Sequence, residues 1–389
     1  MSTNRKVFFL LLTLGAILIA PNVTYYLTGN SPQQIQFPPL QPHPKAGFNW
    51  VVTIIISLLF VSTLLLLLVP RVYGFKKMPP DDQVVNSKTR LPLWFWIGLV
   101  LWLGPLISLC MKSAEPKWLL DWAVLPLFWG FTLVLDGWVY ARNDGKSLVS
   151  TASRELIGIG VVSISGWLIF EYLNFFIRIN WYYPKATLVN HGEFLLYALL
   201  GSSGLMPMAF EWFTLLRTFR LWKYKYRLGP KFQVPNKVKI VLVVLSFIGL
   251  IVAVIAPDRL FYVLWLGPLI ILTIVLEWLG LWTPFIPVRK GDWNALLLFA
   301  LTYLIQGLLL ECWNYLSGNY INGTLQSYNP AYWAYSVPYV DFLHVFEMPI
   351  LGYLGYIPFG VYCWIWWITF SYILDIPTGY TVQEDLIAA

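Results

Sequence analysis

Long apolar runs recur along the whole sequence and leave only short polar segments between them. A membrane-spanning helix needs roughly 20 predominantly apolar residues, and ten runs approach that length. They lie at about 7–20, 49–70, 92–111, 118–140, 155–177, 194–216, 238–256, 260–282, 294–316 and 350–374. Charged residues make up only 12% of the chain, whereas about a quarter of a soluble domain is charged. The pattern predicts an all-α integral membrane protein with about ten transmembrane helices.

The Lys and Arg residues are distributed unevenly over the segments that separate these runs. If the N-terminus is cytoplasmic, the cytoplasmic segments hold twenty of the 26 Lys and Arg, and the segment 217–239 alone holds eight. Such an excess marks the cytoplasmic side of membrane proteins. We therefore expect both termini in the cytoplasm, in a bacterial inner membrane. The net charge of +7 then reflects topology and contacts with anionic membrane lipids, not a nucleic-acid partner.

Two blocks of the sequence resemble each other at an offset of 140–142 residues, which aligns Glu171 and Asn174 with Glu311 and Asn314. Each block contains four runs, an even number, so we expect parallel repeats of the same orientation, related by an axis along the membrane normal. The predicted organisation is an N-terminal two-helix extension with a Pro-rich extracytoplasmic loop (1–91), a first repeat (92–222), a basic cytoplasmic linker (223–239), a second repeat (240–375) and a cytoplasmic tail (376–389).

The N-terminal run resembles a signal sequence, because Asn4-Arg5-Lys6 precedes it. Pro21, directly after Ala20, makes a poor cleavage junction. The first run is therefore predicted to remain as an uncleaved span.

Each repeat carries Glu-x-x-Asn at the end of an apolar run, which places the two polar side chains on one helix face. A charged carboxylate inside a bilayer costs roughly 2.5–3.5 kcal/mol on insertion scales, so it must face protein or water and have a partner. One interpretation is a structural clamp between helices. The other is catalytic, with Glu171 and Glu311 exchanging protons while Asn174 and Asn314 bind and orient the substrate. The sequence leaves both interpretations open.

Histidines precede glutamates at matching places in the two repeats, as His191 with Glu193 and His344 with Glu347. On the predicted topology both pairs lie at the extracytoplasmic surface, where a His–Glu pair can relay protons. His191, His344 and Glu347 are therefore candidate catalytic residues, and Glu193 is a candidate binding residue. No helical His or Glu spacing typical of a metal site accompanies them, so we expect no metal.

Glycine and proline interrupt an apolar run at a matching place in each repeat, at 201–207 and at 349–360. Interrupted helices at equivalent positions of two halves indicate a binding site in the membrane, although simple kinks are an alternative. Aromatic residues near these segments can stack on a ligand or form an interfacial belt. Trp181, Trp313 and Tyr315 are candidate substrate-binding residues on this basis.

Glu211 is a further candidate binding residue, because it lies within the sixth run while its counterpart in the second repeat is Tyr362. Asp136 and Glu277 match each other near the cytoplasmic ends of their runs. There we expect these two side chains to cap helices or to extend toward the membrane surface.

Several motifs that would indicate a reaction class do not occur. The sequence has no Walker loop, dinucleotide fingerprint, HExxH motif or Asp-rich prenyl-transferase motif, so we expect no nucleotide and no tightly bound cofactor. Phe346-Glu347-Met348-Pro349 resembles the Pro/Glu motif of membrane-bound lycopene cyclases, without their paired acids. The resemblance implies only that cofactor-independent proton chemistry on an isoprenoid is a class to consider.

The sequence thus predicts a duplicated polar site near the extracytoplasmic face that binds or chemically processes a hydrophobic, lipid-like or isoprenoid substrate by acid/base chemistry. A proton-coupled secondary transporter that uses the same carboxylates is the first alternative. A non-catalytic subunit of a membrane assembly is the second. The sequence does not decide whether the protein is an enzyme.

Overall fold

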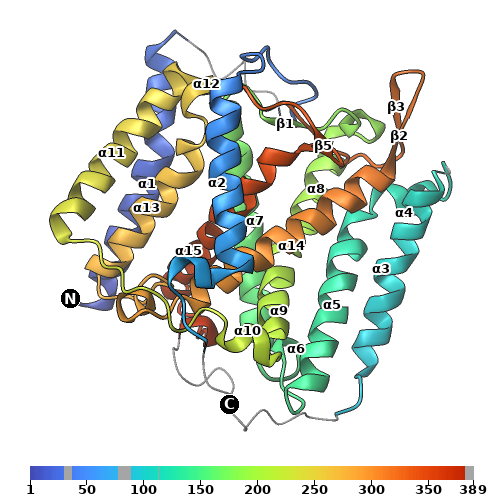
Figure 1. Cartoon of the computed structure of the whole chain (residues 1–389). Coiled ribbons are helices and arrows are strands. Elements are labelled where there is room, and N and C mark those ends of the chain that lie inside the picture. Colours follow the sequence, from blue (N-terminus) through green and yellow to red (C-terminus); the bar gives the residue numbers. More distant parts are fainter. Residues whose placement is uncertain (30–36, 78–88, 113, 382–389) are drawn as a thin grey trace.

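The computed structural model describes residues 1–29, 37–77, 89–112 and 114–381, and most of these residues are helical (Figure 1). The longer helices are α1 (Thr3–Leu27), α2 (Trp50–Leu68), α3 (Leu93–Met111), α5 (Val124–Arg142), α7 (Ser153–Phe175), α8 (His191–Ser202), α9 (Leu205–Arg217), α11 (Asn236–Ile255), α13 (Val263–Trp278), α14 (Asn294–Ser317) and α15 (Tyr356–Ile373). Short helical segments are α4 (Lys117–Asp121), α6 (Leu148–Thr151), α10 (Arg220–Tyr224), α12 (Pro257–Leu260), η2 (Pro70–Tyr73), η3 (Ala186–Leu188), η4 (Pro287–Lys290), η5 (Ile350–Gly355) and η6 (Gly379–Thr381).

Helix length and composition define the class of protein. Among the described residues, eight helical segments are long and apolar enough to cross a membrane, and α8 and α9 together form one of them. The other two apolar runs are also helical, since α13 is an apolar helix of 16 residues and α15 is an 18-residue helix rich in Trp and Tyr. The chain is therefore a helical integral membrane protein, which confirms the class predicted from composition.

The connecting segments gather at the two ends of the helix bundle (Figure 1). The short strands lie at one end together with α4 and α12, whereas the N-terminus, α6 and α10 lie at the other end. Helices α6 and α10 fall within the basic segments 141–154 and 217–239. Those two basic segments and the N-terminus therefore share one end of the bundle, as the alternation of Lys and Arg requires.

Helices α7, α9, α14 and α15 form the centre of the bundle, and the most apolar helices lie at its edge. Only Thr53 and Leu67 of α2 are buried, although almost every residue of that helix is apolar. In contrast, α15 buries most of its length, including Trp364 and Trp367. Apolar side chains that face outward are stable only in a lipid environment, so the outer helices contact the bilayer and the central helices can hold polar side chains.

Glycine allows two of the helix pairs to approach closely. A β-carbon on Gly98 of α3 would lie 2.7 Å from the carbonyl oxygen of Gly130 of α5. A β-carbon on Gly360 of α15 would lie 2.5 Å from Cβ of Tyr303 on α14. Small residues at helix crossings permit this packing inside a membrane, where apolar lipid removes the hydrophobic drive for helices to associate.

Three short antiparallel strand pairs cover one end of the central helices. Strand β1 (Trp181–Tyr182) pairs with β4 (Ala334–Tyr335). Strands β2 (Gly318–Ile321) and β3 (Thr324–Ser327) form a hairpin, and β5 (His344–Val345) pairs with β6 (Met348–Pro349). The first pair joins segments that are about 150 residues apart in the sequence. Trp181 and Tyr335 of this pair line the cavity that is described in the next subsection.

Candidate functional site

Glu171 lies in the last turn of α7 and is buried, with 3% of its surface exposed. Its Oε1 atom accepts hydrogen bonds from the indole N–H of Trp181 at 2.8 Å and from the hydroxyl of Tyr183 at 2.6 Å. Its Oε2 atom is buried and has no hydrogen-bond partner among the described residues. One oxygen of this carboxylate is therefore fixed by protein donors, and the other has no donor among the described residues.

Asn174 lies one turn after Glu171 and holds the segment that supplies those donors. Its side-chain amide donates to the carbonyl oxygen of Trp181 at 2.8 Å and accepts from the backbone N–H of Asn180 at 2.7 Å. The Glu-x-x-Asn spacing thus directs both polar side chains toward one loop. Asn174 binds the backbone of that loop, and Glu171 binds its side chains.

Glu311 and Asn314 repeat this arrangement at the end of α14. Asn314 donates to the carbonyl oxygen of Trp333 at 2.7 Å and accepts from its backbone N–H at 3.0 Å. Glu311 is fully buried and accepts from the hydroxyls of Tyr335 at 2.6 Å and Tyr356 at 2.7 Å. The indole N–H of Trp333 lies 3.2 Å from Oε1 and 3.3 Å from Oε2 of the same carboxylate. Glu311 therefore has more protein donors than Glu171, and both of its oxygens are in contact with one.

Strands β1 and β4 connect these two carboxylate sites. Trp181 pairs with Tyr335, and Tyr182 pairs with Ala334. One Trp-x-Tyr segment thus lies antiparallel to the other, and each segment donates to the glutamate of its own half. The pairing continues past the strands, because the backbone N–H of Ser336 donates to the carbonyl oxygen of Asn180 at 2.8 Å.

Tyr183 and Tyr335 lie outside the membrane-spanning helices, and their phenol groups stay protonated. Burial is the main cause that holds the pKa of Tyr183 well above its ordinary value, and the nearby charge of Glu171 is the second. Burial first and then Glu311 raise the pKa of Tyr335 in the same way. Both phenols therefore keep their protons, and each can donate to its carboxylate over the whole physiological pH range.

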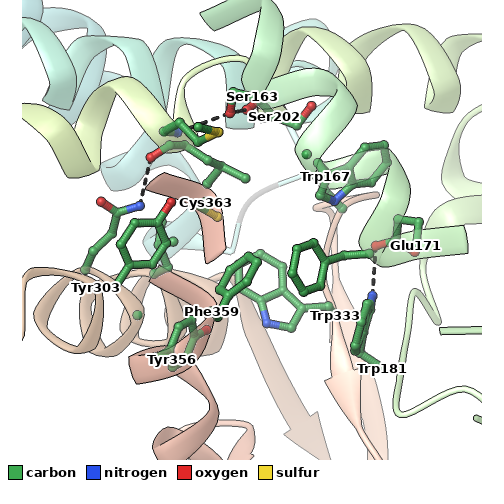
Figure 2. A pocket seen from close by; sticks show the side chains of 18 of the residues that line it. Ser163, Trp167, Glu171, Trp181, Ser202, Tyr303, Trp333, Tyr356, Phe359 and Cys363 are labelled. Atoms are coloured by element: carbon green, nitrogen blue, oxygen red, sulfur yellow. Dashed lines mark hydrogen bonds between the residues drawn. The ribbon is translucent and has the colours of Figure 1, made fainter. Parts of the chain in front are cut away.

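A cavity of ≈ 290 Å³ adjoins this strand pair and lies between α7, α8, α9, α14 and α15 (Figure 2). Its wall is mainly apolar and aromatic and includes Trp167, Phe170, Trp181, Trp333 and Phe359. Glu171 is part of this wall, whereas Glu311 lies behind its donors Trp333, Tyr335 and Tyr356, which do line the cavity. The volume is at the lower end of the range for small-molecule sites, roughly 300–1,000 Å³.

Both interrupted segments of the sequence border the cavity. In the first, α8 ends at Ser202 and α9 begins at Leu205. Ser163 of α7 donates to the carbonyl oxygen of Ser202 at 2.6 Å and accepts from the backbone N–H of Met206 at 3.1 Å. The break therefore leaves backbone groups that a neighbouring helix satisfies, as the membrane interior requires.

Gln306 of α14 also binds this break, since its side-chain N–H donates to the carbonyl oxygen of Leu205 at 2.9 Å. That contact fixes the orientation of the amide, because only its nitrogen can donate to a carbonyl. Its Oε1 atom is buried without a hydrogen-bond partner among the described residues, and Gln306 lines the cavity. In the second interrupted segment, η5 and the start of α15 contribute Gly352, Gly355 and Tyr356 to the same wall.

The described part of the Pro-rich segment after α1, from residue 37 onward, binds the loop that follows α7. The backbone N–H of Tyr183 donates to the carbonyl oxygen of Pro39 at 2.7 Å. Lys45 donates to Oδ1 of Asn180 at 2.5 Å and to the carbonyl oxygen of Ile177 at 3.1 Å. Burial lowers the pKa of Lys45 to about 8. The described part of the N-terminal extension thus holds the segment that supplies the donors of Glu171.

The histidines and their neighbouring glutamates lie outside the cavity wall. His191 and Glu193 are exposed at the start of α8, where Glu193 and Asn190 form a capping box. His344 contacts Asp341 at 3.0 Å, and Glu347 accepts from the hydroxyl of Tyr332. Each glutamate thus has a structural partner other than the histidine that precedes it, and neither expected His–Glu contact occurs among the described residues.

Two aromatic candidates are also placed away from the cavity wall. Trp313 is buried against α3 and α5, with ring centroids 5.2 Å from Phe131 and 6.0 Å from Trp102. Tyr315 is exposed, and the centroid of its ring lies 5.7 Å from that of Phe346. Of the three aromatic candidates, only Trp181 lines the cavity.

Glu211 is fully buried on α9, where its carboxyl group lies beside the side chain of Asp136 and the backbone N–H of Leu148. Its neighbour Asp136 is also fully buried and accepts from Trp94 at 2.8 Å, Ser147 at 2.8 Å and the backbone N–H of Val149 at 2.9 Å. Asp136 therefore connects α3, α5 and the start of α6 instead of extending toward the membrane surface.

Glu277 forms ion pairs with Lys239 and with Arg289, the latter at 2.6 Å. These contacts tie the end of α13 to α11 and η4 by ion pairs, whereas the sequence led us to expect helix capping or extension toward the membrane surface. Among the described residues, no group of three or more His, Cys, Asp or Glu could hold a metal ion.

Tyr183, Tyr335, Tyr356, Gln306 and Ser163 were not among the sequence candidates. The repeated Trp-x-Tyr segments, at 181–183 and 333–335, could have identified the two phenols that donate to the carboxylates. Gln306 and Ser163 carry no comparable signal, because single polar residues within an apolar run usually have a local partner.

The fold and the site define a helical integral membrane protein with a mainly apolar cavity and one partly unpartnered carboxylate in its wall. Comparisons of the chain with protein-family models, curated proteins and solved structures give no match.

Proposed function

We propose that the cavity binds one end of a lipid-like or isoprenoid molecule and that Glu171 exchanges a proton with it by acid/base chemistry. The observation that carries the proposal is the free Oε2 atom of Glu171 in an otherwise apolar wall. Trp181 and Tyr183 fix the carboxylate through Oε1, which keeps Oε2 in place for a proton transfer. An apolar wall with a few placed polar groups is the usual composition of a small-molecule site.

Glu311 has a different role in this proposal. Its oxygens already contact Trp333, Tyr335 and Tyr356, so it positions those three side chains in the cavity wall instead of reacting. Asn174 and Asn314 position the Trp-x-Tyr segments by binding the backbone of each one. Glu171 is therefore the candidate catalytic residue, and the other three polar residues are positioning residues.

The proposal includes a duplicated, ten-span organisation with both termini in the cytoplasm. The matching contacts of Glu171 with Trp181 and of Glu311 with Trp333, together with the antiparallel pairing of β1 with β4, support two related halves. The excess of Lys and Arg in the segments at the N-terminal end of the bundle supports the orientation. The site then lies toward the extracytoplasmic face.

The test of this function compares wild-type protein with Glu171→Gln after reconstitution into a bacterial lipid extract. Mass spectrometry before and after incubation should reveal a lipid that changes only with the wild-type protein, while both proteins have the same thermal stability. Uptake into proteoliposomes that follows a pH gradient, without chemical change, would assign the site to a proton-coupled transporter. If Glu171→Gln only unfolds the protein, the carboxylate is a structural clamp and the acid/base proposal is wrong.

A further inference from the structure

Five hydrogen-bond donors around the cavity are already used by protein acceptors. Trp181 and Tyr183 donate to Glu171, and Trp333 donates to Glu311. The hydroxyl of Tyr356 also donates to Glu311, and Ser163 donates to a backbone carbonyl. A ligand that accepts a hydrogen bond from any of these five side chains would have to break its existing contact.

Two acceptors in the same wall have no donor. Oε2 of Glu171 and Oε1 of Gln306 are both without hydrogen-bond partners among the described residues. The two side chains are only 3% and 1% exposed, respectively. A buried acceptor that lacks a donor costs roughly 1–3 kcal/mol, and more when it is charged. Both side chains line the cavity, so a ligand in the cavity can supply the missing donors.

The charge of the wall excludes one class of ligand. No Lys, Arg or His occurs among the described residues that line the cavity, and Glu171 is its acidic residue. A carboxylate or phosphate group would enter a poorly hydrated space beside a like charge without a cation to balance it. A hydroxyl group or an ammonium group does not meet this obstacle.

Aromatic faces add to the complementarity for such a group. The rings of Phe170 and Trp265 stack with centroids 5.0 Å apart, and Trp181 lies 5.3 Å from Trp265. All three rings line the cavity, as does Glu171, whose carboxylate binds the indole of Trp181. Ring faces attract cations and also pack against the first methylene groups of a chain.

We propose that the molecule in the cavity is a long-chain amphiphile whose polar end donates hydrogen bonds and carries no negative charge. This end is an alcohol or an amine, and it donates to Glu171, with Gln306 as the second acceptor. The inference rests on the proposed function, because it names the ligand class of the same site. It excludes fatty acids and phosphate-ended lipids as ligands of the cavity.

The test uses the full-length protein in nanodiscs and three probes with the same alkyl chain: dodecanol, dodecylamine and dodecanoate. Each probe is added at the same mole fraction of lipid at pH 7.5, and the thermal unfolding midpoint is measured. We expect dodecanol, dodecylamine or both to raise the midpoint of the wild-type protein, with no rise from dodecanoate. The probe that raises the unfolding midpoint identifies the polar group of the ligand.

Variants distinguish binding of a probe in the cavity from an effect of the probe on the surrounding lipid. Glu171→Gln places an amide next to the ligand. The mole fraction of the effective probe that gives the same rise in unfolding midpoint should increase at least tenfold. Asp341→Asn removes the same charge from an exposed residue that does not line the cavity, and it should change nothing. Ala198→Phe fills part of the cavity and should abolish the response to every probe.

Different results would contradict the inferred polar end of the ligand and the use of the cavity as a ligand site. If dodecanoate stabilises the wild-type protein as much as the other two probes, and Ala198→Phe abolishes this, the cavity binds amphiphiles but the inferred polar end is wrong. If no probe responds, or if Ala198→Phe responds like wild type, the cavity is not a ligand site and the proposed function fails as well.

Discussion

The indole N–H of Trp181 donates to Oε1 of Glu171 over 2.8 Å, which ties the loop after α7 to the last turn of that helix. The same indole ring is part of the cavity wall. The contact therefore sets both the orientation of the carboxylate and the shape of the cavity. Trp333 and Glu311 repeat the relationship in the second half of the chain, at 3.2 Å.

Loss of the Asn174 side chain should destabilise the protein. Asn174→Ala leaves the carbonyl oxygen of Trp181 and the N–H of Asn180 without their partners, at a cost of roughly 1–3 kcal/mol for each buried group. Thermal or denaturant unfolding in detergent measures the change. Asn143→Ala, at a partly exposed asparagine whose side chain donates to the carbonyl oxygen of Lys146, should cost less than about 0.5 kcal/mol. Equal losses for the two variants would contradict the assigned contacts.

Glu171→Gln and Glu311→Gln should have unequal effects on stability. Glu311 accepts from three side chains, so an amide in its place turns an N–H toward at least one of those donors. We expect a loss of roughly 1–3 kcal/mol for Glu311→Gln. Glu171→Gln can keep its carbonyl oxygen on Trp181 and Tyr183 and turn its amide to the cavity, so its loss should be under about 1 kcal/mol. Side-by-side unfolding curves test the order, and the reverse order would contradict the different roles of the two residues.

Lys45 should make stability depend on pH. Burial lowers the pKa of Lys45 from 10.5 to about 8 in the folded protein, so the unfolded chain binds more protons between these values. Stability therefore rises as pH increases from about 8 to about 10.5. Because Lys45 is partly exposed, the gain should be only about 1 kcal/mol after solvent screening. Lys45→Gln should remove this part of the pH dependence, and an unchanged slope in the variant would rule out Lys45 as its source.

Asp136 and Glu211 are buried neighbours, but their substitutions should differ in effect. Asp136→Asn turns an amide N–H toward a site where Trp94, Ser147 and Val149 donate, and the mismatch should cost roughly 1–3 kcal/mol. Glu211→Gln can keep its carbonyl oxygen toward the backbone N–H of Leu148 and offers an N–H to Asp136, so stability should change by less than about 1 kcal/mol. A larger loss for Glu211→Gln than for Asp136→Asn would contradict this difference between the two carboxyl groups.

The class of the fold and part of the site could be predicted from the sequence. Apolar runs dictate helices in a membrane, and Glu-x-x-Asn at a helix end marks the two polar positions because an isolated carboxylate there is costly. The interrupted segments also border the cavity, as expected for freed backbone groups. These features depend on local sequence alone.

The partners of the carboxylates could not be predicted in the same way. Trp181 and Tyr335 become neighbours through the pairing of β1 with β4, a contact between distant segments that no local pattern specifies. The histidines show that closeness in sequence can also mislead. The sequence suggested a contact between His344 and Glu347, whereas the turn between β5 and β6 leaves His344 beside Asp341. Tertiary contacts decided both cases.

The most direct test of the central claim is the amount of small molecule that co-purifies with the protein. Native mass spectrometry of the wild-type protein and of Ala198→Phe, purified identically, measures that amount per chain. We expect close to one bound amphiphile per wild-type chain and its loss from Ala198→Phe, while both proteins keep the same unfolding midpoint in empty nanodiscs. An empty wild-type cavity, or equal occupancy in the two proteins, would contradict the claim that this cavity is the ligand site.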